Sequence, residues 1–237
     1  NFAMTSLYMG EFILSQNAPW HYPIVWIAIT SPIVVILFFL FGLLFLIKRI
    51  ITRIIVVDNN MNDIWRGENE MIDIYFLLMV LLPIILFINK GVAYDGWRLL
   101  YFIYPSIIMV AIFGIYYLNL YLKSRLFKVA IYLVIILNLT YLAFWNYKFH
   151  PHQYVYFNFL FKDKFHNNFE KDYWGLTNSH SLNYIINNNT QYPIKIATKS
   201  FSSLETSLLI LDDEDKNKIS IIYNIPEAEF IITNYRI

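Results

Sequence analysis

The chain has 237 residues, of which 58% are hydrophobic and only 15% charged, a balance typical of membrane proteins and outside the range of soluble domains. A net charge of +1 gives no electrostatic reason to expect a nucleic acid as partner, and the lack of cysteine excludes disulfides, thiolate chemistry and cysteine-based metal sites. The positions of Lys and Arg must therefore indicate how the chain is oriented in its membrane.

The first 47 residues predict a surface segment followed by a membrane helix. Residues 1–22 mix apolar patches with polar residues and end in Pro19-Trp-His-Tyr-Pro23, so we expect an extracytoplasmic interfacial segment. They lack the basic start and cleavage site of a signal peptide, which indicates the C-terminal part of a longer protein. Residues 23–47 carry no charge and are long enough to cross a bilayer, with Pro32 and Gly42 as tolerated kink points.

Three further apolar runs complete a membrane domain over residues 23–147. They predict transmembrane helices at about 72–89, 99–122 and 129–147. Basic residues cluster after the first span and between the third and fourth, and such loops face the cytoplasm. The sequence therefore predicts four transmembrane helices in the inner (plasma) membrane, with the loop after the second span and the tail on the extracytoplasmic side.

Residues 148–237 predict a small extracytoplasmic α/β domain. Runs rich in isoleucine at 193–198, 218–223 and 230–234 are typical of strands, and 179–188 is typical of a helix. Ser202-Ser-Leu-Glu205 matches a capping box that opens a short helix ending near Leu211. Because helices and strands alternate, we expect a partly parallel sheet. The fold class is thus a four-helix membrane domain followed by a small α/β domain.

The loop after the second span carries polar and aromatic residues at the edge of the bilayer. Arg98 and Lys90 suit an anionic head group, since the planar guanidinium donates paired charge-assisted hydrogen bonds. Asp95 would orient Arg98 or a sugar hydroxyl. The alternative is an interfacial anchor, in which Tyr94 and Trp97 lie at head-group depth and Arg98 snorkels.

Two further regions carry candidate binding residues. His21 and Tyr22 lie at the same outer surface, and His150 lies close to His152 in the tail. No third ligand accompanies this pair, so we expect hydrogen bonding to a sugar or phosphate, with Gln153 beside it, instead of a metal site. No cofactor is indicated, although a divalent metal ion would be compatible.

The segment before the tail's first helix, residues 168–175, carries carboxylates and aromatic rings close together in sequence. Asp172, Tyr173 and Trp174 could hold a sugar, with the rings covering its C–H faces and the acid accepting from its hydroxyls. The alternative, slightly favoured, is a structural turn in which the rings pack the tail and Asp172 caps a helix.

Four motifs in order resemble those of a known enzyme family. They are Pro19-Trp-His-Tyr-Pro23, Tyr94-Asp-Gly-Trp-Arg98 with Leu-Leu-Tyr-Phe-Ile-Tyr-Pro105, His150-Pro-His-Gln-Tyr-Val-Tyr-Phe-Asn158 and Asp172-Tyr-Trp-Gly175. Together they resemble the C-terminal half of bacterial GT-C glycosyltransferases, relatives of dolichyl-phosphate-mannose protein mannosyltransferases and of the lipid A aminoarabinose transferase.

The resemblance implies an integral membrane enzyme that moves a sugar from a polyprenyl-phosphate donor to an extracytoplasmic glycan, lipid or protein. Such donors need no nucleotide site, and the sequence has no phosphate-cradling glycine loop. The family's acidic catalytic residue lies in an early external loop that no position here matches, so the catalytic residue is unknown. The alternative function is a non-enzymatic membrane scaffold whose external domain binds a partner. The expected substrate-binding residues are His21, Tyr22, Lys90, Tyr94, Asp95, Arg98, His150, Gln153, Asp172, Tyr173 and Trp174.

Overall fold

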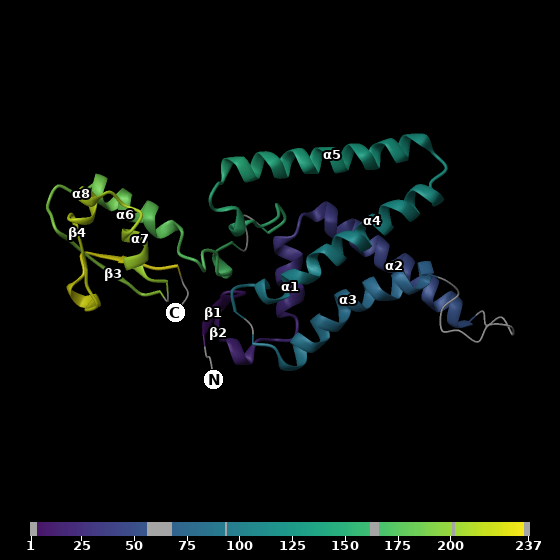
Figure 1. The fold of residues 1–237 in the computed structure, drawn as a ribbon, viewed down its shortest axis with the longest axis horizontal. Coiled ribbons are helices and arrows are strands. Elements are labelled where there is room, and N and C mark those ends of the chain that lie inside the picture. Colours follow the sequence, from purple (N-terminus) through teal and green to yellow (C-terminus); the bar gives the residue numbers. More distant parts are fainter. Residues whose placement is uncertain (1–3, 56–67, 93, 162–165, 201, 235–237) are drawn as a thin grey trace. The chain divides into compact units, whose positions relative to one another are not determined.

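The computed structural model describes residues 4–55, 68–92, 94–161, 166–200 and 202–234. The chain divides into two compact units, each discontinuous in sequence (Figure 1). The helical unit comprises residues 19–91 and 97–148, and the mixed unit comprises 1–18, 92–96 and 149–237. One boundary between the units falls after Lys148. Residues 1–18, expected to lie on the membrane surface as a separate segment, belong to the same unit as the tail.

Among the residues that the structure describes, the helical unit has four helices long and apolar enough to span a membrane, which confirms the expected number. These candidate spans are Ile33–Thr52, Met71–Asn89, Arg98–Tyr121 and Arg125–Lys148. The second belongs to α3 (Glu68–Lys90), which continues through Pro83. The fourth, α5 (Arg125–Lys148), begins earlier than expected because Lys and Arg are good helix formers and extend it into the basic loop.

The first span differs from its prediction. A single helix was expected over 23–47, but α1 (Tyr22–Thr30) ends before α2 (Ile33–Ile55) begins. Ser31 between them is extended, with φ −94° and ψ 147°, because the ring of Pro32 excludes the helical conformation from the residue before it. Pro32 thus ends a helix where a kink was expected, and the span shifts towards the basic residues after Ile47.

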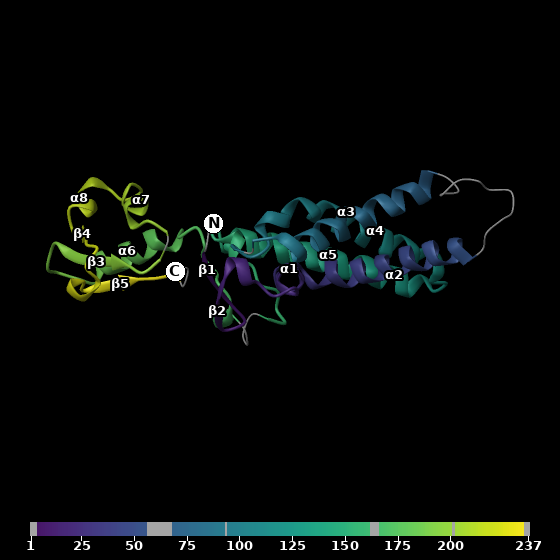
Figure 2. The same ribbon diagram turned by 90° about the horizontal axis from the view of Figure 1, so that it is seen from below.

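The helices α2 and α4 (Tyr104–Tyr121) make the closest packing contact of this unit, and they run side by side in Figure 1 and Figure 2. A β-carbon at Gly42 would lie 1.9 Å from the carbonyl oxygen of Val110, and one at Gly114 would lie 2.2 Å from that of Phe38. These distances are far below van der Waals contact, so the two backbones approach this closely only because both positions are glycine.

A partly buried ion pair ties three helices together at one end of the unit. Arg49 on α2 lies 3.0 Å from the Asp73 carboxylate on α3, whose side chain is 6% exposed. The same guanidinium lies over the ring of Tyr117 on α4, 5.4 Å from its centroid. This contact explains why a carboxylate is tolerated in the first turns of an apolar helix.

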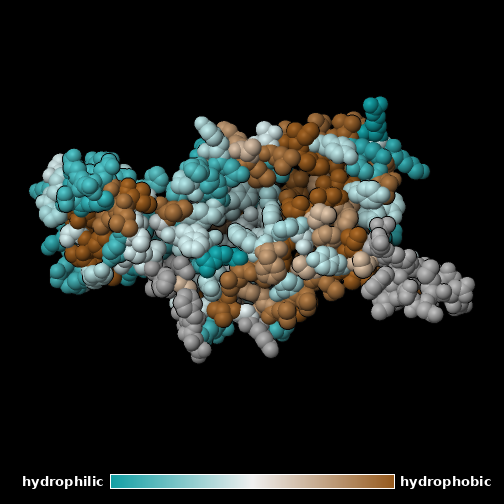
Figure 3. Space-filling model, in the orientation of Figure 1, coloured by the Kyte–Doolittle hydropathy of each residue, from teal (hydrophilic) through white to brown (hydrophobic). Residues whose placement is uncertain are grey.

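Helix α5 is packed only lightly, and none of its residues is buried. One bond to the rest of the unit joins Asn119 Nδ2 to the Tyr132 hydroxyl at 3.1 Å. Figure 3 shows hydrophobic surface over the helices of this unit. A helix that is mostly apolar and largely exposed fits a hydrocarbon surrounding, which needs only that its backbone bonds be made internally.

The mixed unit begins with a β-hairpin that the sequence analysis missed. β1 (Thr5–Tyr8) pairs antiparallel with β2 (Glu11–Leu14) across Met9 and Gly10, whose φ angles of 53° and 88° are those of a primed two-residue turn. The free edge of β1 is covered by the chain at 168–170, because Leu7 accepts from the Glu170 N–H at 2.9 Å and Gly10 donates to the Asn168 carbonyl at 2.9 Å.

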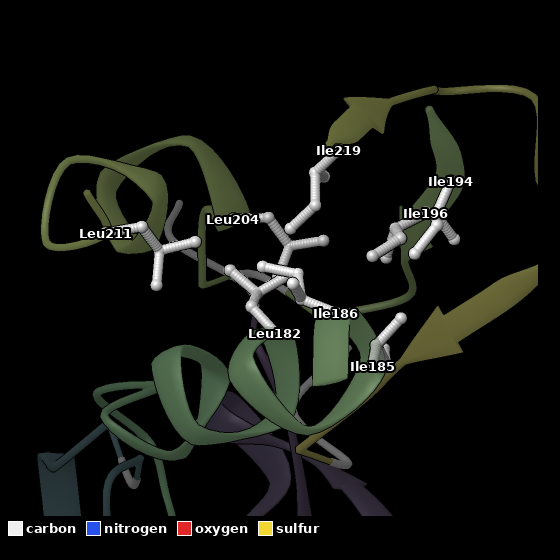
Figure 4. Close-up of a cluster of buried hydrophobic side chains, with 8 residues drawn as sticks. All are labelled: Leu182, Ile185, Ile186, Ile194, Ile196, Leu204, Leu211 and Ile219. Atoms are coloured by element: carbon white, nitrogen blue, oxygen red, sulfur yellow. The ribbon is translucent and has the colours of Figure 1, made fainter. Parts of the chain in front are cut away.

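The tail forms the expected parallel sheet, in the order β4 (Ile219–Ile221), β3 (Ile194–Thr198), β5 (Phe230–Ile232). Helix α6 (Thr177–Asn187) packs against it, and Figure 4 shows apolar side chains from helix and strands meeting in one core. The core residues are Leu182, Ile185, Ile186, Ile194, Ile196, Leu204, Leu211 and Ile219. Alternate isoleucines of β3 supply the sheet side of this core, as the period of two predicts.

The connection from β3 to β4 holds two short helices, α7 (Leu204–Leu208) and α8 (Asp213–Lys216). The capping residue of α7 is Ser203, whose Oγ accepts from the Thr206 N–H, and not Ser202 as the capping-box match placed it. The fully buried Leu204 sets this register, because the helix must begin where that side chain enters the core. The helix also ends at Leu208, short of the predicted Leu211.

Candidate functional site

The predicted binding residues fall in both units. His21, Tyr22, Lys90 and Arg98 belong to the helical unit, while Tyr94, Asp95, His150, Gln153, Asp172, Tyr173 and Trp174 belong to the mixed unit. The geometry of each set is described within its own unit.

His21 is the N-cap residue of α1 and Tyr22 is its first residue, but the two side chains differ in burial. His21 packs its ring edge-on to Trp20, with centroids 5.5 Å apart. Tyr22 is completely buried, with its ring beside that of Trp26 at 6.1 Å. Tyr22 therefore fixes the start of α1, and His21 is the member of this pair that can meet a ligand.

Arg98 opens a short 3-10 helix, η2 (Arg98–Ile103), that leads directly into α4. The preceding Trp97 is 5% exposed, and its indole N–H donates to the Thr30 hydroxyl at 2.7 Å, which in turn donates to the Trp26 carbonyl at 2.6 Å. This chain of bonds fastens the start of η2 to α1. Trp97 was expected at the membrane interface. It is buried instead, because its N–H has a partner inside the unit.

Arg98 is half-buried as a residue and is the first residue of a helix long enough to span a membrane. Its backbone is held by the tie between Trp97 and Thr30. Lys90 is the last residue of α3, and its side chain lies outside the described part of the chain. Arg98 is thus the cation whose position the structure defines best at this edge of the helical unit.

Asp95 occupies a tight turn in the mixed unit. It has φ 54° and the next residue, Gly96, has φ 63°, so two successive residues adopt the left-handed conformation. Asp tolerates that conformation better than most residues, yet here its carboxylate is also buried, with the residue 1% exposed. The neighbouring Tyr94 is half-buried. Left-handed backbone and a buried charge are both costly, and such features gather at functional sites.

The carboxylate of Asp172 caps the start of α6 from four residues before the N-cap residue, Leu176. This carboxylate accepts from the N–H groups of Leu176 and Thr177 at 3.0 and 2.8 Å, from the Thr177 hydroxyl, and from the Tyr154 hydroxyl. A negative charge that meets the free N–H groups of a first turn is favourable. This geometry supports the alternative reading of Asp172 as a capping residue, because its oxygens are already occupied by donors of its own unit.

Tyr154 is a partner of Asp172 that the sequence analysis did not identify. Burial raises the pKa of its phenol, and the hydrogen bond to the Asp172 carboxylate raises it further. The phenol therefore stays protonated at neutral pH and remains a permanent donor. Since 18 positions separate the two residues, no local sequence pattern could have joined them.

The rings next to Asp172 differ in exposure. Tyr173 is 9% exposed and its ring meets that of Tyr154 edge-on at 5.4 Å, whereas Trp174 is 56% exposed. His150 and Gln153 lie in contact, with Gln153 Nε2 2.7 Å from His150 Nδ1. Trp174, His150 and Gln153 are therefore the members of this set that can meet a sugar, while Tyr173 supports the fold.

Glu170 is a third buried carboxylate in the mixed unit, in addition to Asp95 and Asp172, and the residue is 2% exposed. Its backbone N–H pairs with Leu7 of β1, so the hairpin fixes its position. No cluster of three or more His, Asp or Glu side chains suited to a metal ion occurs within the described ranges.

No protein-family model, curated protein or solved structure matches this chain. Function is therefore inferred from the side chains and their surroundings.

Proposed function

We propose that the chain is part of an integral membrane glycosyltransferase that moves a sugar from a polyprenyl-phosphate donor to an extracytoplasmic acceptor. The single observation that carries the proposal is the placement of Arg98. Arg98, a half-buried residue, begins an apolar helix of span length, and its backbone is fastened by the bond from Trp97 to Thr30. A lipid-linked phosphate stays at the membrane edge, since its charge is costly in hydrocarbon, and a cation at that edge can bind it.

The other proposed contacts are those of a sugar site. Within the mixed unit, Trp174 offers an open aromatic face, and His150 and Gln153 offer hydrogen bonds. Asp95 keeps the expected role of orienting a sugar hydroxyl, because its buried carboxylate lies in a turn of left-handed backbone. These assignments need no nucleotide and no cofactor, in keeping with a donor that carries its sugar on a lipid phosphate.

Replacement of Arg98 with lysine is expected to weaken binding of polyprenyl phosphate by about tenfold, which corresponds to about 1.4 kcal/mol. A lysine keeps the charge but lacks the planar pair of donors that a phosphate accepts from arginine. Binding would be measured with the purified chain in nanodiscs, by titration with polyprenyl phosphate. The matched control is Arg125→Lys, at the exposed start of the equally apolar α5, which should bind as the wild type does.

Equal affinity in the Arg98→Lys and Arg125→Lys variants would identify Arg98 as an interfacial anchor and remove it from the site. The second candidate function, a membrane scaffold whose mixed unit binds a partner, would then be preferred. It has its own support in exposed apolar side chains of that unit, where Leu209, Ile210 and Tyr223 are 76%, 72% and 87% exposed.

The proposal also requires the mixed unit to face away from the cytoplasm. Because the sequence contains no cysteine, single cysteines can report this directly. We expect a membrane-impermeant maleimide to label Tyr223→Cys in intact cells, and to label Arg125→Cys only after lysis. Tyr223 is 87% exposed in the mixed unit, and Arg125 begins α5 beside the basic loop. The reverse labelling pattern would invert the orientation and exclude an extracytoplasmic acceptor.

A further inference from the structure

Two histidines far apart in sequence meet in the mixed unit. His152 lies just before the short helix η3 (Gln153–Val155), and His180 lies on α6. Their ring centroids are 5.2 Å apart, with the ring planes inclined at 56°. Neither belongs to the proposed sugar contacts, so the pair needs its own explanation.

The separation of the two rings fits a shared metal ion. An imidazole nitrogen binds zinc at about 2.0–2.1 Å, and two imidazoles at a tetrahedral angle on one ion have centroids roughly 5 Å apart. The observed 5.2 Å agrees with this value. The rings are therefore already spaced as two ligands of one ion would be.

The hydrogen bonding of His152 also favours a bound metal ion. Its Nδ1 is buried and has no hydrogen-bond partner within the described part of the chain. A buried polar nitrogen without a partner is unfavourable, and the neutral imidazole lone pair is a preferred ligand for zinc, copper and nickel. His180 is exposed on its helix, so an ion can reach the pair from solvent and keep water in its remaining positions.

One carboxylate holds both histidine-bearing segments in place. Asp172 accepts from the first-turn N–H groups of α6, which carries His180, and from the hydroxyl of Tyr154, two residues after His152. The His152 segment is closed by its own turn, in which the His152 N–H donates to the Phe149 carbonyl at 2.6 Å. Ligands held by such supporting bonds lose little freedom when they bind an ion.

We propose that His152 and His180 bind a divalent transition-metal ion, with zinc as the preferred occupant and water completing its coordination. The ion joins the segment around residues 149–158 to α6. It uses histidines that the sugar contacts do not use, so it can be tested apart from the proposed transferase.

The test uses the full chain without a histidine tag, dialysed against zinc and analysed for bound metal. We expect one equivalent of zinc in the wild type and at least a tenfold weaker affinity in His152→Ala and in His180→Ala. Zinc should also raise the melting temperature of the wild type by about 5 °C, since an ion that binds only the folded state stabilises it. His166→Ala, in η4 (His166–Asn168), is the matched control and should retain zinc.

Copper gives an independent reading of the ligands. Electron paramagnetic resonance of the Cu²⁺-loaded wild type should show hyperfine splitting from two nitrogens, and each single variant should show one. His180→Ala is the decisive variant, because an exposed helical position accepts alanine without a cavity and the protein should fold. Zinc affinity in His180→Ala equal to that of the wild type, or no zinc in the wild type, would overturn the proposal.

Discussion

The variant Gly114→Leu is expected to separate α2 from α4 and to prevent the helical unit from reaching its folded form. Gly114→Ala should already destabilise it by about 3 kcal/mol, the upper end of the usual cost of overpacking. The new β-carbon would lie 2.2 Å from the Phe38 carbonyl oxygen. This oxygen belongs to the backbone, so it cannot rotate out of the way as the end of a flexible side chain can. Gly42→Ala should behave alike, since its β-carbon would meet the Val110 carbonyl oxygen at 1.9 Å.

Thermal unfolding of the purified chain in detergent, followed by size-exclusion chromatography, would measure this loss. Alanine is a better helix former than glycine by about 0.8–1.0 kcal/mol, so a loss of stability in Gly114→Ala cannot come from helix propensity. Ala130→Leu on the exposed surface of α5 is the matched small-to-large control and should be silent. A Gly114→Ala protein as stable as the wild type would show that the backbones do not approach so closely.

The second large effect is expected from Asp172→Asn. The amide keeps the shape of the side chain but replaces one acceptor oxygen with a donor, which would face the N–H and O–H donors around it. We expect the mixed unit to lose about 2–3 kcal/mol, the range for losing a charged hydrogen-bond acceptor in a buried site. Amide protons of α6 should then exchange roughly 30- to 150-fold faster with deuterium, as local opening becomes easier.

Asp213→Asn provides the control for charge removal. Its side chain is 96% exposed and pairs with Lys216 on the surface of α8, so its loss should leave exchange in α6 unchanged. Exchange in α6 that is equally slow in Asp172→Asn and in the wild type would show that Asp172 does not cap the helix, and would favour its role in sugar binding.

The parts of the fold that depend on local patterns were predictable. The four apolar helices, the isoleucine-rich strands and α6 all follow from length and periodicity, which act over a few neighbouring residues. Pro32 is visible in the sequence, but a local pattern does not distinguish a kink in a helix from the end of one. In a free-standing helix a proline can be a kink, whereas here Ser31 adopts an extended conformation and the helix ends.

The hairpin was missed because its turn carries an unusual residue. Primed two-residue turns favour Asn or Asp before Gly, and Met9 takes that position here with φ 53°. The flanking runs are only four residues long, too short for alternation to be distinguished from chance. What fixes the hairpin is the pairing of Leu7 with Glu170, a tertiary contact that no local pattern contains.

The candidate residues show the same limit. Sequence patterns indicated Asp95, Arg98 and the Asp172 segment because they combine charge with aromatic neighbours. They could not separate Tyr22, which is buried, from His21 beside it, nor Tyr173 from the open ring of Trp174. Tyr154 and His180 escaped notice because their importance comes from partners at distant positions.

The discontinuity of the mixed unit sets an order on the events of folding. The edge of β1 is covered by residues 168–170, so the entire helical unit is synthesised between the hairpin and the segment that covers it. Until the last apolar helix has emerged, β1 has an open edge with exposed N–H and carbonyl groups, which invites pairing with another chain. Contacts between positions so far apart in sequence form slowly, so we expect the mixed unit to fold last. Aggregation through the open edge of β1 is most favoured before that step.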